Sequence, residues 1–155
     1  MANPIRPAQP TDLPGILNLI RDLARFERAE PEFVLQEREL HEALFGLNPL
    51  CFAWLAQIQE QTAGFLLGYY RFSTWKGRML YVEDIYVKEA FRGQGLGQKL
   101  MQAAIQKARE ENLAGLTWQV LDWNQPAIDW YKKMGARLDS EWINVRLLPP
   151  PILEP

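Results

Sequence analysis

The sequence predicts an α/β fold: a single domain in which helices flank a central mixed, mostly antiparallel sheet. Segments with the apolar spacing of helices alternate along the chain with short runs rich in aromatic and β-branched residues. Three of those runs follow one another in mid-chain with links of hairpin length, which favours an antiparallel meander over an all-parallel sheet. The expected order of elements is β-α-α-β-β-β-α-β-α-β.

Length, charge and cysteine content restrict the class of protein. The chain has 155 residues, 48% of them hydrophobic, enough for one domain with its own core. Its formal net charge of −2 argues against general nucleic-acid affinity and mildly favours small cationic substrates. One cysteine rules out an internal disulfide framework, and one histidine beside it makes a structural zinc site improbable. Without a signal-peptide pattern or an apolar run of transmembrane length, a cytoplasmic enzyme or binding domain with no membrane contact is expected.

The first half of the chain predicts one strand and two helices. Residues 5–8 form a short opening strand, and Thr11 or Asp12 then caps a helix. A second helix covers residues 36–45 and stops at the glycine that follows. The apolar stripe that turns the first helix toward the core consists of Ile16, Leu19, Ile20, Leu23 and Phe26.

The second half predicts the sheet and the remaining helices. Residues 52–58, 63–72 and 79–87 are the three strands of the meander. A helix from residue 96 to about residue 111, a strand at 116–121, a helix at 126–134 with Gly135 as its C-cap, and a closing strand at 142–148 then follow. The domain is expected to span residues 1–148, and residues 149–155 form a Pro-rich, extended or loose tail.

A glycine-punctuated turn is the strongest functional signal. Residues 92–97 read Arg-Gly-Gln-Gly-Leu-Gly, directly after the third central strand and directly before a helix. Glycine permits positive φ and close approach of the backbone to a ligand, so successive amides can converge on an anion at the helix N-terminus. Arg92 adds a positive charge, and a pyrophosphate fits the arrangement. The spacing matches neither a P-loop nor a dinucleotide fingerprint, and a turn that only links strand to helix is the alternative.

These residues resemble the acetyl-CoA pyrophosphate loop, R/Q-x-x-G-x-G/A, of the GCN5-related N-acetyltransferase (GNAT) superfamily. Stretches 73–78, 81–87 and 120–125 look like the spermidine/spermine N-acetyltransferase family, with the thialysine Nε-acetyltransferase branch as the closest match. The resemblance implies a GNAT fold, acetyl-CoA as cosubstrate, no metal and a homodimer. The residues expected to bind acetyl-CoA are Ile85, Tyr86, Val87, Arg92, Gly93, Gln94, Gly95, Leu96, Gly97, Gln98, Asn124, Pro126, Ala127 and Tyr131.

Two adjacent acids interrupt the third central strand. Charged residues are seldom buried without a partner, and strand alternation places Glu83 and Asp84 on opposite faces. A lysine-like ammonium must lose a proton before it attacks a thioester, and a nearby carboxylate can attract the cation and accept that proton. The resemblance assigns proton acceptance to Glu83 and amine binding to Asp84. The alternative is that both acids only pair with Arg78, Arg92 or loop amides.

Asn124 and Tyr131 lie at the start and on the second turn of the penultimate element. Asn124 or Gln125 suits the helix N-cap, followed by Pro126 in the first turn. A phenol near the leaving sulfur can protonate CoA thiolate as a general acid. The resemblance gives Asn124 a contact with CoA and Tyr131 that acid role, whereas a core position is the alternative for the tyrosine.

Three further residues are candidates for substrate binding: Glu27, Trp75 and Glu141. Glu27 matches a substrate-binding glutamate of the family, although solvated acids are the alternative for Glu27 and Glu141, and a loop anchor for Trp75. Related polyamine acetyltransferases carry an acid where this chain has Ser73, which weakens a polyamine substrate. Cys51 suits a buried filler, and His41 a surface or half-buried helix position beside Phe45.

The sequence as a whole predicts an acetyl-CoA-dependent N-acetyltransferase that acts directly, in a ternary complex, on the primary amine of a small cationic molecule. Thialysine, lysine-like amino acids, polyamines and diamines are the candidate acceptors. Two other functions stay open: a CoA-binding regulator without turnover, and an acetyltransferase for protein N-termini or lysines.

Overall fold

The structure is a computed structural model and describes residues 3–149. The chain forms two compact units, the first ending at Gln119 and the second beginning at Val120. Apart from Pro149, the Pro-rich tail expected at 149–155 lies outside the described residues. Among residues 3–149, no helix combines the length and the apolar character required to cross a membrane.

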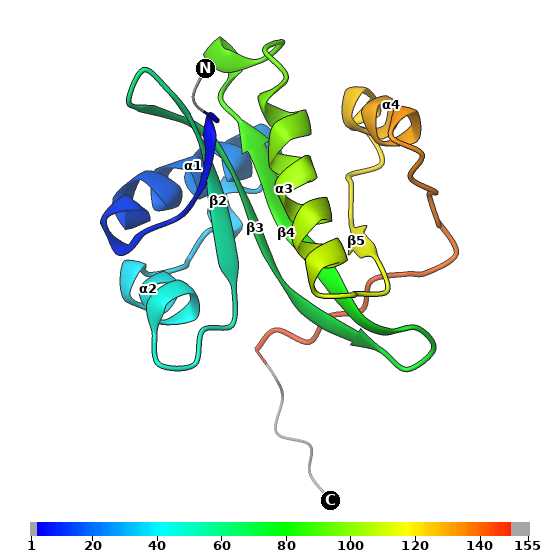
Figure 1. Ribbon diagram of the computed structural model, residues 1–155. Coiled ribbons are helices and arrows are strands. Elements are labelled where there is room, and N and C mark those ends of the chain that lie inside the picture. The colour runs from blue at the N-terminus through cyan, green and yellow to red at the C-terminus, as the bar shows by residue number, and fades with distance from the viewer. Residues whose placement is uncertain (1–2, 150–155) are drawn as a thin grey trace, which may run out of the picture. The chain divides into compact units, whose positions relative to one another are not determined.

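The first unit is built on a five-stranded mixed sheet of order β1-β2-β3-β4-β5 (Figure 1). Strands β1 to β4 pair antiparallel in sequence order, and β5 lies parallel to β4. This confirms the predicted meander and the mixed sheet. The strands are β1 (Ile5–Pro7), β2 (Phe52–Ile58), β3 (Gln61–Ser73), β4 (Gly77–Val87) and β5 (Leu116–Trp118).

Three helices cover the two faces of this sheet. α1 (Leu13–Phe26) and α2 (Glu37–Phe45) lie on one face, and α3 (Leu96–Glu110) crosses the other (Figure 1). Their bounds agree with the predicted ranges to within two residues. The core between α1, α2 and the sheet consists of Leu13, Ile16, Leu19, Leu23, Leu40, Leu44, Ala53, Leu55, Phe65 and Leu67. The apolar side of α3 is buried through Leu96, Leu100, Met101, Ala104 and Ala108.

Two details of α1 differ from the prediction. Asp12 is the N-cap residue, one of the two predicted, but its carboxylate binds the Arg6 guanidinium at 2.7 Å and accepts no hydrogen bond from the helix amides. Phe26 is 40% exposed and does not join the core stripe. The spacing of apolar residues places a side chain on a helix face, but whether the sheet extends far enough to cover the last turn is a tertiary property.

The second unit contains α4 (Gln125–Lys133), with Asn124 at its N-cap and Met134 at its C-cap. Gly135, predicted as the C-cap, adopts a left-handed φ of 85° one residue later. The predicted closing strand at 142–148 is wrong, because none of these residues is in a strand and Ile143 and Val145 are 86% and 88% exposed. Alternating residues favour a strand only when a second strand accepts their backbone hydrogen bonds.

Candidate active site

A β-bulge sits in β4 at the predicted pair of acids. Asp84 lies opposite Leu67 on β3, and Val82 lies opposite Gly68, so Glu83 is an extra residue without a register partner. Bulges break the alternation of side chains and re-aim them, and they are enriched next to active sites. The alternation argument that placed Glu83 and Asp84 on opposite faces therefore does not hold here.

The two acids differ in exposure and interact electrostatically. Glu83 is exposed, whereas Asp84 is partly buried. Burial raises the pKa of Asp84 from 3.8 to about 7, and the negative charges of Glu83 and Glu27 add to the shift. Burial and then the charge of Glu83 raise the pKa of the Tyr69 and Tyr81 phenols as well. A carboxyl with a pKa near neutrality, beside two other acids, is the electrostatic pattern of a functional site rather than of a solvated surface.

Glu27 joins these strand acids from the end of α1. It is the residue that caps the helix, and partial desolvation raises its pKa. Glu27, selected separately from the adjacent pair Glu83 and Asp84, is thus close enough for its charge to act on Asp84. Carboxylates near one another attract a cation, and their mutual repulsion raises the pKa of the buried one toward neutrality.

The glycine turn has the conformation that an anion site requires. Gly93 and Gly95 have φ values of 76° and 75°, and a Cβ added at either would meet no atom within 4 Å. Glycine is therefore favoured at both positions by the left-handed backbone conformation and not by a lack of space for a side chain. Gly95 is the N-cap of α3, and no side chain caps the amides that begin the helix. An uncapped 15-residue helix preceded by two left-handed glycines offers convergent N–H donors and the positive end of the helix dipole.

The remaining residues of the turn are placed unevenly. Gln94 and Gln98 are exposed beside the helix start, whereas the Leu96 side chain is buried in the core at 2% exposure. Leu96 is therefore limited to its backbone as a cofactor contact.

One edge of β4 lies open beyond the bulge. β3 pairs with β4 as far as Val87, but β5 pairs with it only from Leu80 to Val82. Within the described sheet, residues 83–87 consequently have a strand neighbour on one side alone. The backbone groups of Ile85 and Val87 face this open side. Those of Tyr86 face β3, because the Lys88 amide two residues later bonds to the Ala63 carbonyl and every second residue of a strand directs its backbone groups the same way.

The side chain of Arg92 is fixed by a hydrogen bond and by contacts with two aromatic rings. Its Nε donates a hydrogen bond to the Val87 carbonyl at 2.9 Å. Its guanidinium carbon lies 5.1 Å from the Phe26 ring centroid and 5.6 Å from that of Tyr86. Arg92 therefore ties the glycine turn to both α1 and β4.

The candidates in the second unit sit on α4 and on the chain that follows it. Asn124 accepts a hydrogen bond from the Ala127 amide at 3.4 Å, so it does act as the N-cap, with Pro126 in the first turn. Tyr131 is buried at 7% exposure, and its ring lies 5.1 Å from that of Trp130. Glu141 is exposed, and its amide donates to Asp139.

Of the other residues considered in the sequence, Ser73, Cys51 and His41 have structural roles, whereas Trp75 is left exposed. Trp75 is 84% exposed in the β3–β4 turn. The Ser73 hydroxyl accepts hydrogen bonds from the Trp75 and Lys76 amides at 3.3 and 3.2 Å, so this residue stabilises the turn. Cys51 packs against the core, and burial raises the pKa of its thiol, which disfavours a nucleophilic role. His41 contacts Phe45 edge-on at 6.0 Å, as predicted.

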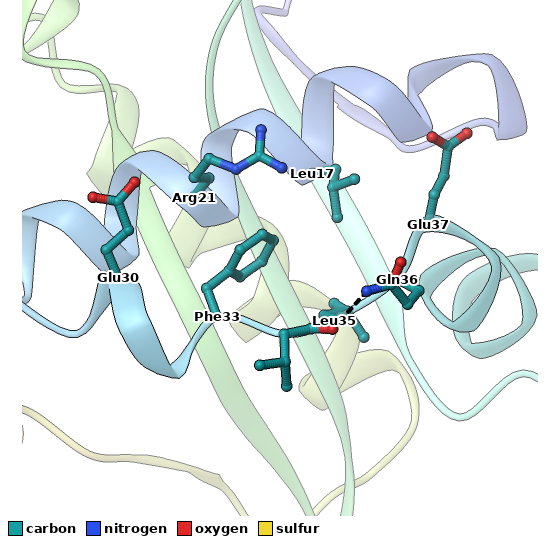
Figure 2. A pocket seen from close by; sticks show the side chains of 8 residues that line it. Leu17, Arg21, Glu30, Phe33, Leu35, Gln36 and Glu37 are labelled. Carbon is teal, nitrogen blue, oxygen red and sulfur yellow. Dashed lines mark hydrogen bonds between the residues drawn. The ribbon is translucent and has the colours of Figure 1, made fainter.

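A surface pocket of about 520 Å³ lies between α1 and the segment that leads to α2 (Figure 2). Arg21 extends over the Phe33 ring, with 5.2 Å from guanidinium to centroid, and Glu30 and Glu37 lie at the two ends of the pocket (Figure 2). None of the predicted site residues lines it. The mixed sequence of residues 30–37 gives no periodic signal from which the pocket could have been predicted.

Comparison with known proteins identifies the class. The model of the Acetyltransferase (GNAT) family matches residues 15–136. The chain therefore belongs to the GNAT family of acetyltransferases, which confirms the resemblance read from the glycine turn and establishes it as an N-acetyltransferase.

Individual relatives agree with the branch that the sequence indicated. Thialysine N-epsilon-acetyltransferase of Bos taurus is 38% identical over 141 residues, which cover 86% of this chain and 83% of that protein. L-ornithine N5-acetyltransferase NATA1 of Arabidopsis thaliana is 28% identical and covers 95% of this chain and 85% of its own length. Among solved structures, a probable acetyltransferase with 28% identity has a TM-score of 0.75 and covers 97% of this chain and 98% of its own.

Proposed function

We propose that this chain transfers an acetyl group from acetyl-CoA to the primary amine of a small cationic molecule, in a ternary complex. One observation carries the proposal. An uncapped helix start with two left-handed glycines follows β4, and the same strand holds Glu83 and Asp84 at its bulge. A phosphate-binding end and an amine-binding end on one strand fit a cofactor that is anionic at one end and reactive at the other.

The residues present fit CoA. The amides after Gly95 and the charge of Arg92 suit a pyrophosphate, and the open edge of β4 along 85–87 suits an amide-containing arm. When bound, acetyl-CoA supplies an acetyl thioester. The contacts proposed from the second unit are those of Asn124, Pro126, Ala127 and Tyr131.

The acids of β4 have distinct tasks in the proposed reaction. An alkyl ammonium with a pKa of about 10.4 is almost fully protonated at neutral pH. Asp84 and Glu27 bind the cation, and the exposed Glu83 accepts its proton, directly or through a water. The amine nitrogen then bonds to the acetyl carbon as the carbon–sulfur bond breaks. Tyr131 donates its proton to the departing sulfur, and the second proton that the nitrogen loses returns to the Tyr131 phenolate through solvent.

The named relatives support a lysine-like acceptor. Two are named for acetylating the Nε of thialysine and the N5 of ornithine, both amino-acid side-chain amines. In this chain Ser73 stabilises a turn where the polyamine enzymes carry an acid. We therefore place basic amino acids ahead of polyamines as acceptors, with Trp75 and Glu141 as proposed secondary contacts.

The test is CoA release from acetyl-CoA with thialysine, lysine, ornithine, spermidine, spermine and simple diamines as acceptors. We expect turnover with at least thialysine or ornithine. Glu83→Gln should lower kcat strongly, whereas Glu89→Gln, the same change at an exposed acid beyond the end of β4, should not. CoA binding without turnover on any amine would overturn the proposal in favour of a regulator, and turnover on peptides alone would favour a protein acetyltransferase.

A homodimer, which the family resemblance implies, and a cytoplasmic location, which the sequence pattern predicts, complete the proposal. Exposed apolar side chains at 142–148, among them Trp142 at 74%, support self-association. Light scattering should give twice the chain mass of 18.0 kDa, and a monomer at micromolar concentration would contradict it.

A further inference from the structure

The Arg92 guanidinium lies between two aromatic rings that belong to different parts of the first unit. Phe26 is the last residue of α1, and Tyr86 lies near the end of β4. Their ring centroids are 5.1 and 5.6 Å from the guanidinium carbon. The bond from Arg92 Nε to the Val87 carbonyl, at 2.9 Å, fixes the direction in which the side chain extends.

Phe26 packs on this guanidinium and does not join the core. The Phe26 ring is 40% exposed, whereas Leu19 and Leu23, which lie on the same apolar face of α1, are buried. A guanidinium over an aromatic face is stabilised by the ring quadrupole. The contact therefore ties the end of α1 to the turn that begins at Arg92.

The end of α1 also carries one of the acids of the amine site. Glu27 follows Phe26 directly and caps the helix, and its charge acts on Asp84. The chain then turns sharply, because Arg28 adopts a left-handed φ of 60°. The position of Glu27 relative to β4 consequently depends on how firmly Phe26 is held.

We propose that Phe26 is a positioning residue that, through its stack on Arg92, couples the cofactor turn to the amine-binding acid Glu27. The inference rests on the proposed function. CoA phosphates that restrain the turn at Arg92 also restrain the end of α1 through Phe26. Glu27 is then already in position when the amine substrate binds. Because coupling between two ligands is reciprocal, the amine strengthens CoA binding by the same factor.

Hydrogen–deuterium exchange tests the first half of this coupling. CoA alone should slow exchange of the amides of residues 23–29 in the wild-type protein, because CoA binding would reduce the motion of the end of α1. Phe26→Leu should remove that protection, Phe26→Tyr should restore it because the ring is kept, and Phe72→Leu, at a 71% exposed phenylalanine of β3, should leave it intact. Protection that survives Phe26→Leu, or none in the wild type, overturns the proposal.

Calorimetric titration tests the second half. We expect thialysine to bind about fivefold or more tightly in the presence of saturating CoA, and to lose that gain in Phe26→Leu. Thialysine affinity that is the same with and without CoA overturns the coupling alone. Failure of the wild type to bind CoA overturns both the coupling and the proposed function, so the two failures are distinguishable.

Discussion

The charge of Glu27 raises the pKa of Asp84, which lies 57 positions later in the sequence. Burial is the larger cause of the raised pKa of Asp84, followed by the charge of Glu83 and then that of Glu27. The relationship joins the end of α1 to the bulge of β4. Carboxylates that repel one another do not stabilise the folded protein. Their proximity therefore points to a ligand that carries positive charge.

The first prediction concerns stability and Asp84→Asn. A carboxyl whose folded pKa is raised makes the folded state bind its proton more tightly, so its contribution to stability is present at low pH and is lost as pH rises to about 7. The asparagine variant lacks this loss. Its free energy of unfolding relative to wild type should therefore rise by about 3 kcal/mol between pH 5 and pH 8.5. Urea unfolding at both values measures it, and a pH-independent difference would contradict the buried-acid account.

The second prediction separates backbone strain from cofactor binding. Gly95 and Gly77 have φ values of 75° and 90°, and neither has an atom within 4 Å of an added Cβ. Alanine at either position should cost about 1 kcal/mol of stability, because L-residues disfavour this conformation. Only Gly95→Ala, which distorts the start of α3, should also weaken CoA binding. Calorimetry that gives both variants the same CoA affinity would remove the glycine turn from the cofactor site.

The third prediction concerns Arg28. The amides of Arg28 and Ala29 bond back to Arg25 and Ala24, the same pattern with which α4 ends at Gly135 and Ala136. This motif prefers glycine at its left-handed position. Arg28→Gly should therefore raise the free energy of unfolding by about 0.5 kcal/mol.

Its matched control is Gly135→Ala, which should lower the free energy of unfolding by about 1 kcal/mol. Loss of stability in Arg28→Gly would mean that contacts of the arginine side chain outweigh its backbone strain.

The fourth prediction concerns Tyr131→Phe. If the phenol protonates the leaving sulfur, its removal should lower kcat by about 100-fold while CoA affinity changes little. The pH profile of kcat should also lose its alkaline limb. Tyr81→Phe, a phenol on β4 that no role is proposed for, is the comparison. An unchanged kcat in Tyr131→Phe would exclude the tyrosine from the reaction.

Local patterns were sufficient to predict most of the first unit. The aromatic and β-branched runs gave β2 its observed ends, and the glycine turn placed the start of α3 at Leu96. These elements are set by side-chain periodicity and by the conformational freedom of glycine, both of which are readable from neighbouring residues. The glycine turn could be identified for the same reason.

Features that depend on distant partners were not predictable. The bulge at Glu83 exists only in the register between β3 and β4, so the alternation rule failed there. The stack of Phe26 on Arg92 joins segments that no local pattern relates. The segment 142–148 has the composition of a strand but no strand partner among the described residues, and composition alone does not provide one.

The most direct test of the central claim is to incubate the protein with isotopically labelled acetyl-CoA and thialysine and to identify the product by mass spectrometry. We expect thialysine that carries the labelled acetyl group on its side-chain amine, formed by the wild type and by Glu89→Gln but greatly reduced in Glu83→Gln. Labelled product that forms equally fast in Glu83→Gln would contradict the role of the β4 acids. Absence of labelled product with thialysine and with every other amine of the panel, from protein that binds CoA, would contradict the assignment as a small-amine acetyltransferase.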